Sequence, residues 1–288
     1  MTDLRRIIWL ASFPKSGNTW TRIFLANYIM GGEKAVDINR LHEFTTADVR
    51  GDFFDRAAGG TYRGETFDDW MELRPTALRL IAQSRPGTHF VKTHNRIMRI
   101  GPYDLIPPEV TAAAIYVMRN PFDVAPSYAQ HMGWPIDDAV ERMASPTNTT
   151  STPQLIFELP GRWDEHIESW LKAPGLPRHV MRYEDLVADA EKTFRSLLSF
   201  LQVPLDFGRL RRAIRASSFN TLKKMEADKG FKERPATAKA FFRKGKTGTW
   251  REELSPSQVA RIREAFLPMI ENHYPEMLEE TASFAASA

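Results

Sequence analysis

One loop of the sequence combines a lysine, a glycine and several hydroxyl and amide side chains between an apolar run and a helical stretch. This loop, Ser12–Trp20 (SFPKSGNTW), is suited to binding an anion. Backbone N–H groups at the start of a helix point outward, the helix dipole favours negative charge there, and Gly17 lets the backbone come close to a phosphate. Lys15 can neutralise that phosphate. The loop therefore predicts a phosphate site, and the alternative is a helix cap whose lysine is merely exposed.

The loop differs from the Walker A loop that binds the phosphates of ATP or GTP. The Walker A pattern G-x-x-x-x-G-K-[ST] needs a first glycine that is absent here, and Lys15 precedes the remaining glycine. The sequence therefore predicts phosphate binding without a Walker A loop.

The elements that must position this loop follow a repeated pattern of a short apolar run, a turn and a helical stretch. The apolar runs are Ile7–Phe13, His89–Thr93, Ala113–Met118 and His179–Arg182. Helical stretches follow three of them, at Thr19–Met30, Pro121–Gln130 and Ala188–Leu201, and a Pro-rich connection follows His89–Thr93. Continuous apolar strands that alternate with helices favour a parallel sheet covered on both faces. The predicted fold class is α/β with three layers, and its ligands should bind at the carboxyl ends of the strands.

Length and composition set outer bounds on the protein. With 288 residues, 42% hydrophobic and 26% charged, we expect a single domain, 1–288, with one substantial core. The chain has no cysteine, which excludes disulfides, thiolate metal sites and a cysteine nucleophile and is compatible with a reducing compartment. A net charge of +3 does not indicate a nucleic-acid partner. Ile7–Phe13 is too short for a membrane span and lacks the cleavage site of a signal peptide.

Four motifs, in order along the chain, resemble those of the cytosolic sulfotransferases that depend on 3′-phosphoadenosine 5′-phosphosulfate (PAPS). Phe13–Trp20 resembles the family's YPKSGTTW, and Val91–His94 is similar to the segment with its catalytic histidine. Tyr116–Tyr128 (YVMRNP through SY) resembles the 3′-phosphate motif, and Arg243–Arg251 (RKGKTGTWR) resembles RKGxxGDWK. The resemblance implies a P-loop-like sulfotransferase fold, a cytoplasmic location, and transfer of a sulfuryl group from PAPS to a hydroxyl of a small organic acceptor.

The resemblance also assigns the donor-binding residues. Those for the 5′-phosphosulfate are Lys15, Ser16, Gly17, Asn18 and Thr19, and those for the 3′-phosphate are Arg119, Ser127, Arg243, Lys244 and Gly245. Trp20 and Phe219 would sandwich the adenine, Tyr183 would reach its edge, and Ser217 and Ser218 lie beside Phe219. The alternatives are a structural ion pair of Arg119 with Asp123, a solvated basic loop at Arg243, and aromatics that belong to the core.

The resemblance implies a catalytic group of three residues. His94 would be the general base, Lys92 would stabilise charge at the transferring group, and Lys15 would stabilise the leaving phosphate. No metal is required by this reading, since lysines can do here what Mg²⁺ does in phosphoryl transfer. His131, in the helix after Arg119, is the second candidate for the base.

The sequence departs from the family pattern at several points. Asn18 stands where the family often has Thr, and Thr249 and Arg251 replace Asp and Lys of the last motif. Pro126 falls inside a predicted helix and should kink it directly before Ser127. The family's KxxxTVxxxE dimer segment is not matched at residues 251–260, so no dimer is predicted.

The acceptor side is less defined. Phe44–Trp70 and Ala144–Gln154 are predicted as loops, either surface connections or acceptor-side lids. Ser255–Tyr274 is predicted as an amphipathic helix and Thr281–Ala288 as a frayed end. An apolar pocket for a phenol, alcohol or aromatic metabolite is suggested by Phe53, Phe54, Trp70, Met71, Met132, Gly133, Trp134 and Phe157.

Two other functions stay open at this point. A nucleotide-binding module without catalysis would use the same phosphate loop, but it would not need His94 beside the sulfuryl group. A small-molecule kinase would use the loop for ATP. The missing Walker A spacing and the two extra basic motifs suited to a 3′-phosphate argue against that kinase.

Overall fold

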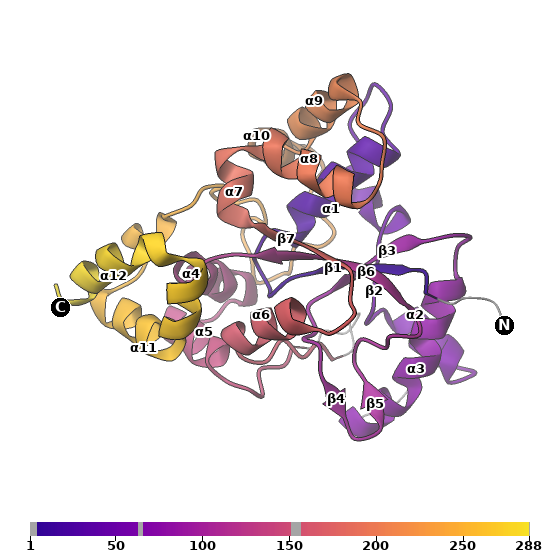
Figure 1. The fold of residues 1–288 in the computed structure, drawn as a ribbon, viewed down its shortest axis with the longest axis horizontal. Helices are drawn as coiled ribbons and strands as arrows, with labels where there is room; N and C mark the ends of the chain where they lie inside the picture. Colours follow the sequence, from indigo (N-terminus) through magenta and orange to yellow (C-terminus); the bar gives the residue numbers. More distant parts are fainter. Residues whose placement is uncertain (1–4, 63–65, 151–156, 288) are drawn as a thin grey trace.

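Five parallel strands form the centre of the molecule, in the order β2-β3-β1-β6-β7 (Figure 1). The computed structural model describes residues 5–62, 66–150 and 157–287. The strands are β1 (Ile7–Ala11), β2 (Thr46–Ala47), β3 (His89–Thr93), β6 (Thr111–Met118) and β7 (Arg178–Arg182). A separate antiparallel hairpin joins β4 (Arg99–Ile100) and β5 (Tyr103–Asp104) in the Pro-rich connection. The predicted α/β class with a parallel central sheet is confirmed.

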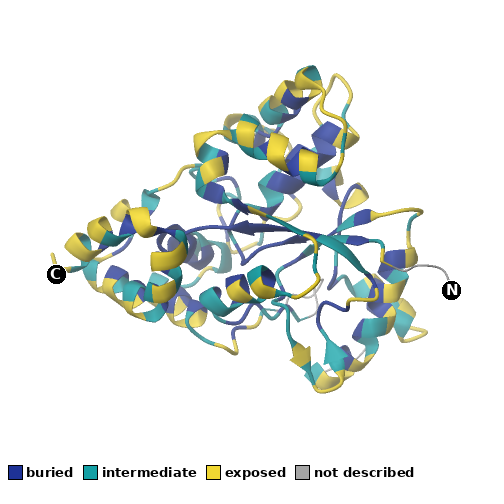
Figure 2. Cartoon of the chain, in the orientation of Figure 1, coloured by how far each residue is buried: buried dark blue, intermediate teal, exposed yellow. Residues whose placement is uncertain are grey.

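Helices cover both faces of this sheet, because its strands are apolar on both sides. One face packs against α1 (Asn18–Ile29), α8 (Ala190–Phe200), α9 (Phe207–Ala216) and α10 (Phe219–Lys229). The other packs against α3 (Phe67–Gln83), α4 (Pro121–Met132), α6 (Trp163–Lys172) and α11 (Pro256–His273). Alternate residues of β6 serve the two cores: Ile115 and Val117 belong to the first, and Tyr116 and Met118 to the second. Figure 2 shows the buried strands between helices whose outer sides are exposed.

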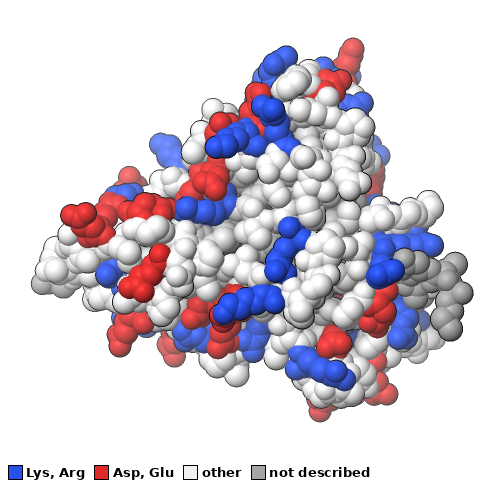
Figure 3. All heavy atoms as spheres, in the orientation of Figure 1, with Lys and Arg blue, Asp and Glu red and all other residues white. Residues whose placement is uncertain are grey.

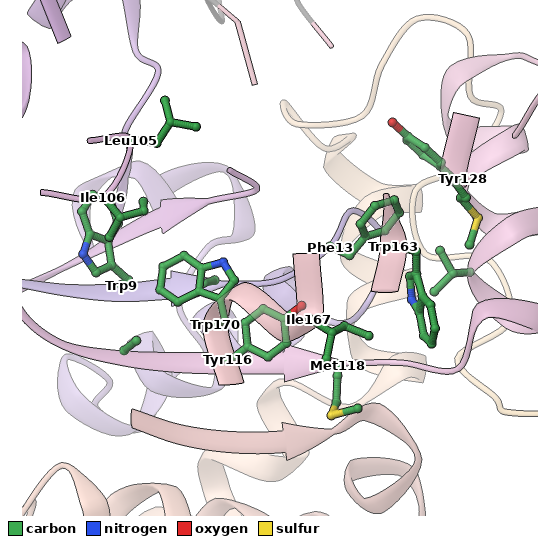
Figure 4. Packing of buried hydrophobic residues seen from close by; sticks show 14 of the residues in the cluster. Trp9, Phe13, Leu105, Ile106, Tyr116, Met118, Tyr128, Trp163, Ile167 and Trp170 are labelled. Carbon is green, nitrogen blue, oxygen red and sulfur yellow. The ribbon is translucent and has the colours of Figure 1, made fainter. Parts of the chain in front are cut away.

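The second core is rich in large aromatic side chains. Trp9, Tyr116, Trp163 and Trp170 are fully buried in it, as Figure 4 shows from close by. The indole of Trp9 donates to Thr111 Oγ1 at 2.9 Å, so its polar atom is not left unpaired. This aromatic layer lies directly beneath the loops that follow β1 and β6.

The remaining elements correct several expectations. They are α2 (Gly51–Ala57), α5 (Ile136–Met143), α7 (Tyr183–Ala188), α12 (Leu278–Ala285), and the 3₁₀ turns η1 (Ile38–Glu43), η2 (Thr249–Glu252) and η3 (Pro275–Met277). Phe44–Trp70, predicted as a loop, contains β2, α2 and the start of α3. Most of the predicted frayed end belongs to α12, which packs on α11, and Phe284 of α12 contacts Trp250 of η2.

One helix prediction also needs correction. The stretch Ala188–Leu201 divides at Asp189, whose carboxylate accepts from Lys192 N and caps α8. The chain before Asp189 forms the short helix α7. α4, predicted as Pro121–Gln130, runs from Pro121 to Met132 and contains Pro126.

The strand register brings the ends of three strands together. Ala11 at the end of β1 pairs with Thr93 of β3 and with Tyr116 of β6. Ser12, His94 and Arg119 follow these strands and therefore lie at one edge of the sheet. On the face shown in Figure 3, the described acidic and basic side chains are interspersed. None of the helices in residues 5–62, 66–150 and 157–287 is long and apolar enough to cross a membrane.

Candidate functional site

A cavity of about 840 Å³ opens at the carboxyl ends of β1, β3 and β6. Its donor half is the part lined by residues that the family resemblance assigns to the sulfuryl donor. These are Lys15, Gly17, Asn18, Thr19, Trp20, Arg119, Ser127, Tyr183, Ser217, Phe219, Arg243, Lys244 and Gly245. Its acceptor half lies around Lys92 and His94 and includes Thr46, Tyr128, His131, Thr150 and Glu158. Residues far apart in the sequence therefore share one cavity.

The loop before α1 leaves the N-terminus of that helix open. Gly17 is the N-cap, with φ of 109°, and no side chain caps the helix. A Cβ atom at Gly17 would lie 2.9 Å from Tyr183 Cδ2, so both the backbone angle and the space require glycine. Ser16 Oγ is buried and has no partner among the described residues. The open N-terminus of the helix and its dipole fit a phosphate or sulfate oxygen.

Arg119 extends from the end of β6 across the donor half. Its Nη1 donates to Lys15 O at 3.2 Å, and its guanidinium lies 4.1 Å from the ring centroid of Tyr183. Asp123 Oδ2 is 3.9 Å from Arg119 Nη2, too far for a hydrogen bond. Asp123 instead accepts from Gly248 N at 2.8 Å and Trp250 N at 3.1 Å. The ion pair between Arg119 and Asp123 is thus a weak contact, and Arg119 Nε has no partner among the described residues.

The chain from residue 230 to residue 250, named the strap here, borders the cavity opposite α1. Gly245, with φ of 62°, lies against Phe219, and a Cβ atom there would be 2.3 Å from Phe219 Cδ2. Arg243 is paired with Glu253, and Lys244 Nζ lies 3.0 Å from Glu252 Oε2. The basic pair is therefore paired with acidic side chains in a partly exposed part of the strap.

Lys15 lies between the two halves of the cavity. Its backbone has φ of 67°, its Nζ is 3.4 Å from His131 Nδ1, and it lies 4.2 Å from the ring centroid of Phe241. Burial, and then the charges of Arg119 and Lys92, lower the pKa of Lys15 to about 7. Burial and the charge of Lys15 lower the pKa of His131 to about 2. His131 is therefore neutral, and an anion at this site would favour the charged form of Lys15.

His94 has one ring nitrogen fixed and the other free to act. Its Nδ1 lies 2.7 Å from Ser12 O, a carbonyl that can only accept, so Nδ1 carries the proton. Burial, and then the charge of Lys92, hold the pKa of His94 well below its usual value of 6.5. The neutral imidazole therefore has an unprotonated Nε2, the form required of a general base.

A buried pair behind His94 fixes its peptide group. His166 Nε2 donates to His94 O at 3.1 Å, and Tyr116 OH donates to His166 Nδ1 at 2.8 Å. Burial lowers the pKa of His166 to about 3, so this ring stays neutral and keeps one donor and one acceptor. Neither residue was predicted, because their sequence context is that of ordinary core positions.

A buried ion pair holds the residues on both sides of His94. Asp48 Oδ2 lies 2.6 Å from Arg74 Nη2, with both side chains fully buried. The same oxygen accepts from Thr93 Oγ1 at 3.0 Å and from Asn95 Nδ2 at 2.8 Å. Because Thr93 and Asn95 both donate to this one carboxylate oxygen, Asp48 ties down the residues on either side of His94.

Most of the residues suggested for an apolar acceptor pocket do not line the cavity. Phe53, Phe54, Trp70 and Met71 belong to the buried core, and Phe157 and Trp134 pack against that core. Of the residues suggested for the pocket, only Met132 lines the cavity. Lys92 Nζ and Glu158 Oε1 face each other there at 3.7 Å. Of the predicted loop Ala144–Gln154, Thr150 lines the cavity, and residues 151–156 lie outside the described part of the chain.

An ion pair fastens the strap to α1 at this side of the cavity. Arg22, which is 3% exposed, donates through Nη1 and Nη2 to the two carboxylate oxygens of Glu233, each at 2.8 Å. The Glu233 side chain is 34% exposed; its partial burial would raise the pKa, but the pairing with Arg22 outweighs it and lowers the pKa to about 2. The two residues are 211 positions apart, and no motif in the sequence connects them.

The structure leaves two of the predicted donor residues off the cavity lining. Ser16 points into the protein, and Ser218 caps α10, where its Oγ accepts from Thr221 N at 3.5 Å. In the described residues, no group of three or more His, Cys, Asp or Glu side chains could hold a metal ion.

The profile of the sulfotransferase domain matches residues 5–278. Cytosolic sulfotransferase 10 of Arabidopsis thaliana is 24% identical over 270 residues, covering 88% of this chain and 75% of the relative. Flavonol 3-sulfotransferase of Flaveria bidentis is 24% identical over 272 residues, covering 88% and 78%.

Solved structures have the same fold. A retinol dehydratase in complex with androsterone and the inactive cofactor PAP aligns with a TM-score of 0.66 at 20% identity, over 94% of this chain and 83% of that one. A mouse sulfotransferase complexed with PAP aligns with a TM-score of 0.60 at 20% identity, over 99% and 90%.

Proposed function

Since this chain belongs to the sulfotransferase domain family, we propose that it transfers the sulfuryl group of PAPS to a hydroxyl of a small organic acceptor in the cytoplasm. The observation that carries the proposal is the meeting of two features at one edge of the sheet. The open N-terminus of α1 with Lys15 is suited to the phosphosulfate, and His94 with its free Nε2 lies at the next strand end.

The reaction is an in-line displacement at sulfur. The acceptor O–H gives its proton to His94 Nε2 while the acceptor oxygen forms a bond to sulfur. The bond between sulfur and the bridging oxygen breaks, and its electron pair stays on the 5′-phosphate of the product, 3′-phosphoadenosine 5′-phosphate (PAP). The donor loses one sulfuryl group, and the acceptor gains it as a sulfate ester.

The lysines act where charge develops. Lys15 would contact the bridging oxygen and the 5′-phosphate, where negative charge grows as the S–O bond breaks. Lys92 would contact the sulfuryl oxygens from the acceptor half. The lowered pKa of Lys15, about 7, implies that the bound phosphate raises it again and keeps the ammonium charged when it is needed.

The rest of the donor half would hold the nucleotide. Trp20, Phe219 and Tyr183 would contact the adenine, with Ser217 and Ser218 beside it. Arg119 and Ser127 would bind the 3′-phosphate together with Arg243, Lys244 and Gly245. The unpaired Nε of Arg119 supports this role, because a buried guanidinium N–H needs an acceptor. The ion pairs of Arg243 and Lys244 with Glu253 and Glu252 would have to loosen for phosphate binding.

Thermal stabilisation by PAP, compared with ADP, tests the donor site directly. Wild type should be stabilised strongly by PAP and little by ADP, because ADP lacks the 3′-phosphate. Arg119→Ala should lose most of the stabilisation by PAP and keep its small response to ADP. Equal stabilisation of wild type by both nucleotides would overturn the assignment of the donor and favour a kinase that uses ATP.

A further inference from the structure

Three carboxylates line the cavity, and one of them lacks strong partners. Asp123 accepts two backbone N–H bonds, from Gly248 and Trp250. Glu233 is bound through both oxygens by Arg22. Glu158 has no comparable partner among the described residues, although it is only 7% exposed.

The contacts of Glu158 are long. The nearest cation is Lys92, whose Nζ lies 3.7 Å from Oε1, beyond hydrogen-bond distance. Oε2 accepts one bond, from Thr150 Oγ1 at 3.5 Å, and Oε1 accepts none from the described residues. A buried carboxylate is costly unless a cation or several N–H or O–H groups satisfy it. Glu158 is therefore suited to a further positively charged partner.

Lys92 has a competing role during the reaction. Under the proposed function, its ammonium turns to the sulfuryl oxygens when the donor is bound. Because Lys92 is the only described side-chain cation within 4 Å of Glu158, that turn removes the nearest counter-charge of Glu158. The carboxylate then needs a new cation at the moment when the acceptor occupies this half of the cavity.

Two neutral oxygen atoms accompany Glu158 in the acceptor half. Thr46 Oγ1 is buried without a partner among the described residues, Tyr128 OH is buried beside the side chain of Asn148, and both Thr46 and Tyr128 line the cavity. Burial, with a contribution from the charge of Glu158, raises the pKa of Tyr128 above its usual value, so its hydroxyl stays protonated. Figure 4 shows that the Tyr128 hydroxyl points away from Phe13 and Trp163 in the core. A carboxylate with nearby neutral oxygens suits an ammonium, which has N–H donors and no acceptor.

We propose that the acceptor carries a protonated amine in addition to the hydroxyl that is sulfated, and that Glu158 binds this ammonium. The proposal rests on the proposed sulfotransferase function and names its acceptor class. Basic residues at the mouth of the cavity would instead favour an anionic acceptor, but they are exposed. Arg50 is paired with Asp52 at 2.7 Å, and Arg234 donates to a backbone carbonyl at 2.8 Å. Exposed charges are screened by salt, whereas a charge inside the cavity is screened much less.

Matched acceptors test the proposal in wild type. Tyramine, 4-ethylphenol and 3-(4-hydroxyphenyl)propionic acid share one phenol and differ in the charge of the tail. 6-Aminohexan-1-ol and hexan-1-ol make the same comparison for alcohols. With PAPS as donor, kcat/KM should be about 10–100-fold higher for the amine than for its neutral match. The propionic acid should be the poorest of the phenols.

Glu158→Gln tests the residue, because it removes the charge and keeps the shape. The ratio of kcat/KM for tyramine to that for 4-ethylphenol should fall close to one in this variant. The ratio is internal to each variant, so a general loss of activity cancels. Glu141→Gln, at an exposed position of α5, is the matched control and should keep the wild-type ratio. If Glu158→Gln does not fold, the preference for tyramine over 4-ethylphenol is measured in Glu158→Asp and compared with that of wild type.

The failure of this proposal and that of the proposed function give different results. No stabilisation by PAP and no transfer to any compound would refute the function itself. Stabilisation by PAP with kcat/KM for 4-ethylphenol or the propionic acid equal to or above that for tyramine would refute only the amine acceptor. If no compound is turned over, binding replaces turnover as the readout. Tyramine should then raise the Tm of the PAP complex more than 4-ethylphenol or the propionic acid does, and an equal or smaller rise would refute the amine acceptor.

Discussion

The two halves of the cavity are built by different means. The donor half is made by short continuous segments, in which the backbone itself forms the site: the loop before α1, the end of β6 and the turn around Gly245. The acceptor half is made by single side chains from distant segments, such as Lys92 facing Glu158 and Arg22 bound to Glu233.

This difference separates what a sequence can reveal from what it hides. A loop with a required glycine and a positive φ leaves a readable pattern, because few residue types fit it. A pocket made of single side chains leaves no local pattern, since each residue is chosen by partners elsewhere in the chain. The donor half should therefore tolerate few backbone changes, and the acceptor half should respond to changes of side-chain charge.

The largest expected effect comes from His94→Ala, which acts where the two halves meet. Loss of the base should lower kcat by about 10²–10⁴-fold, while thermal stabilisation by PAP should stay close to wild type. Because the pKa of His94 lies well below 6.5, the acidic limb of the kcat/KM profile should lie below pH 6.5 in wild type and be absent in the variant.

His131→Ala is the matched control for the histidine. A larger loss of kcat in His131→Ala than in His94→Ala would move the base to His131. Steady-state kinetics of both variants across the same pH range shows whether His94 or His131 is the base.

The next effect tests the backbone of the donor half. Gly245→Ala should weaken PAP binding by about 10–100-fold, because the new Cβ would displace Phe219 and because φ of 62° is strained for alanine. Isothermal titration with PAP measures the affinity. Gly175→Ala has a similar φ of 68° but an open surrounding, and it should leave PAP affinity unchanged. Equal affinity of Gly245→Ala and wild type would show that the turn does not shape the donor half.

A smaller effect concerns pH and Lys15. With a pKa of about 7 in the free protein, Lys15 loses its proton as the pH rises above 7, and PAP binding must restore it. PAP affinity should therefore fall by up to about tenfold per pH unit above 7, with uptake of about one proton. Titrations at pH 8 in buffers of different ionisation enthalpy measure that uptake. Lys15→Arg stays charged and should show none; the same uptake in that variant would contradict the role of Lys15.

The fold could be predicted well where a pattern was long and continuous. β3 was predicted with its observed bounds, and β1 and β6 within two residues at each end, because buried parallel strands are uninterrupted apolar runs. β2 has only two residues, so it has no pattern to detect. The chain around Asp189 reads as one helix, because a cap inside a helical pattern resembles an ordinary acidic residue.

The site residues were likewise predicted where they belong to a continuous motif and missed where they stand alone. The motif residues of the donor half were predicted, and all except Ser16 and Ser218 line the cavity. Glu158, Asp48 and His166 were not predicted, because a single acid or histidine has no spacing to interpret. The aromatic residues assigned to the acceptor pocket were wrong for a physical reason: a large apolar side chain is more often buried in the core than exposed in a cavity.

The smallest expected effect concerns the ion pair that joins α1 to the strap. Glu233→Gln removes the charge opposite the buried Arg22 and should lower the free energy of unfolding by about 1–2 kcal/mol at pH 7. The pKa of Glu233 is lowered from 4.5 to about 2, so its contribution is complete above pH 4.5 and is lost as the pH falls toward 2. The difference in Tm between wild type and variant should therefore vanish over that pH window. Arg40 and Glu43 form an exposed pair, and Glu43→Gln should change Tm little at any pH. If Glu233→Gln changed Tm as little as Glu43→Gln, the Arg22–Glu233 pair would contribute little to stability. The acceptor half would then depend less on side-chain charge than its ion pairs indicate.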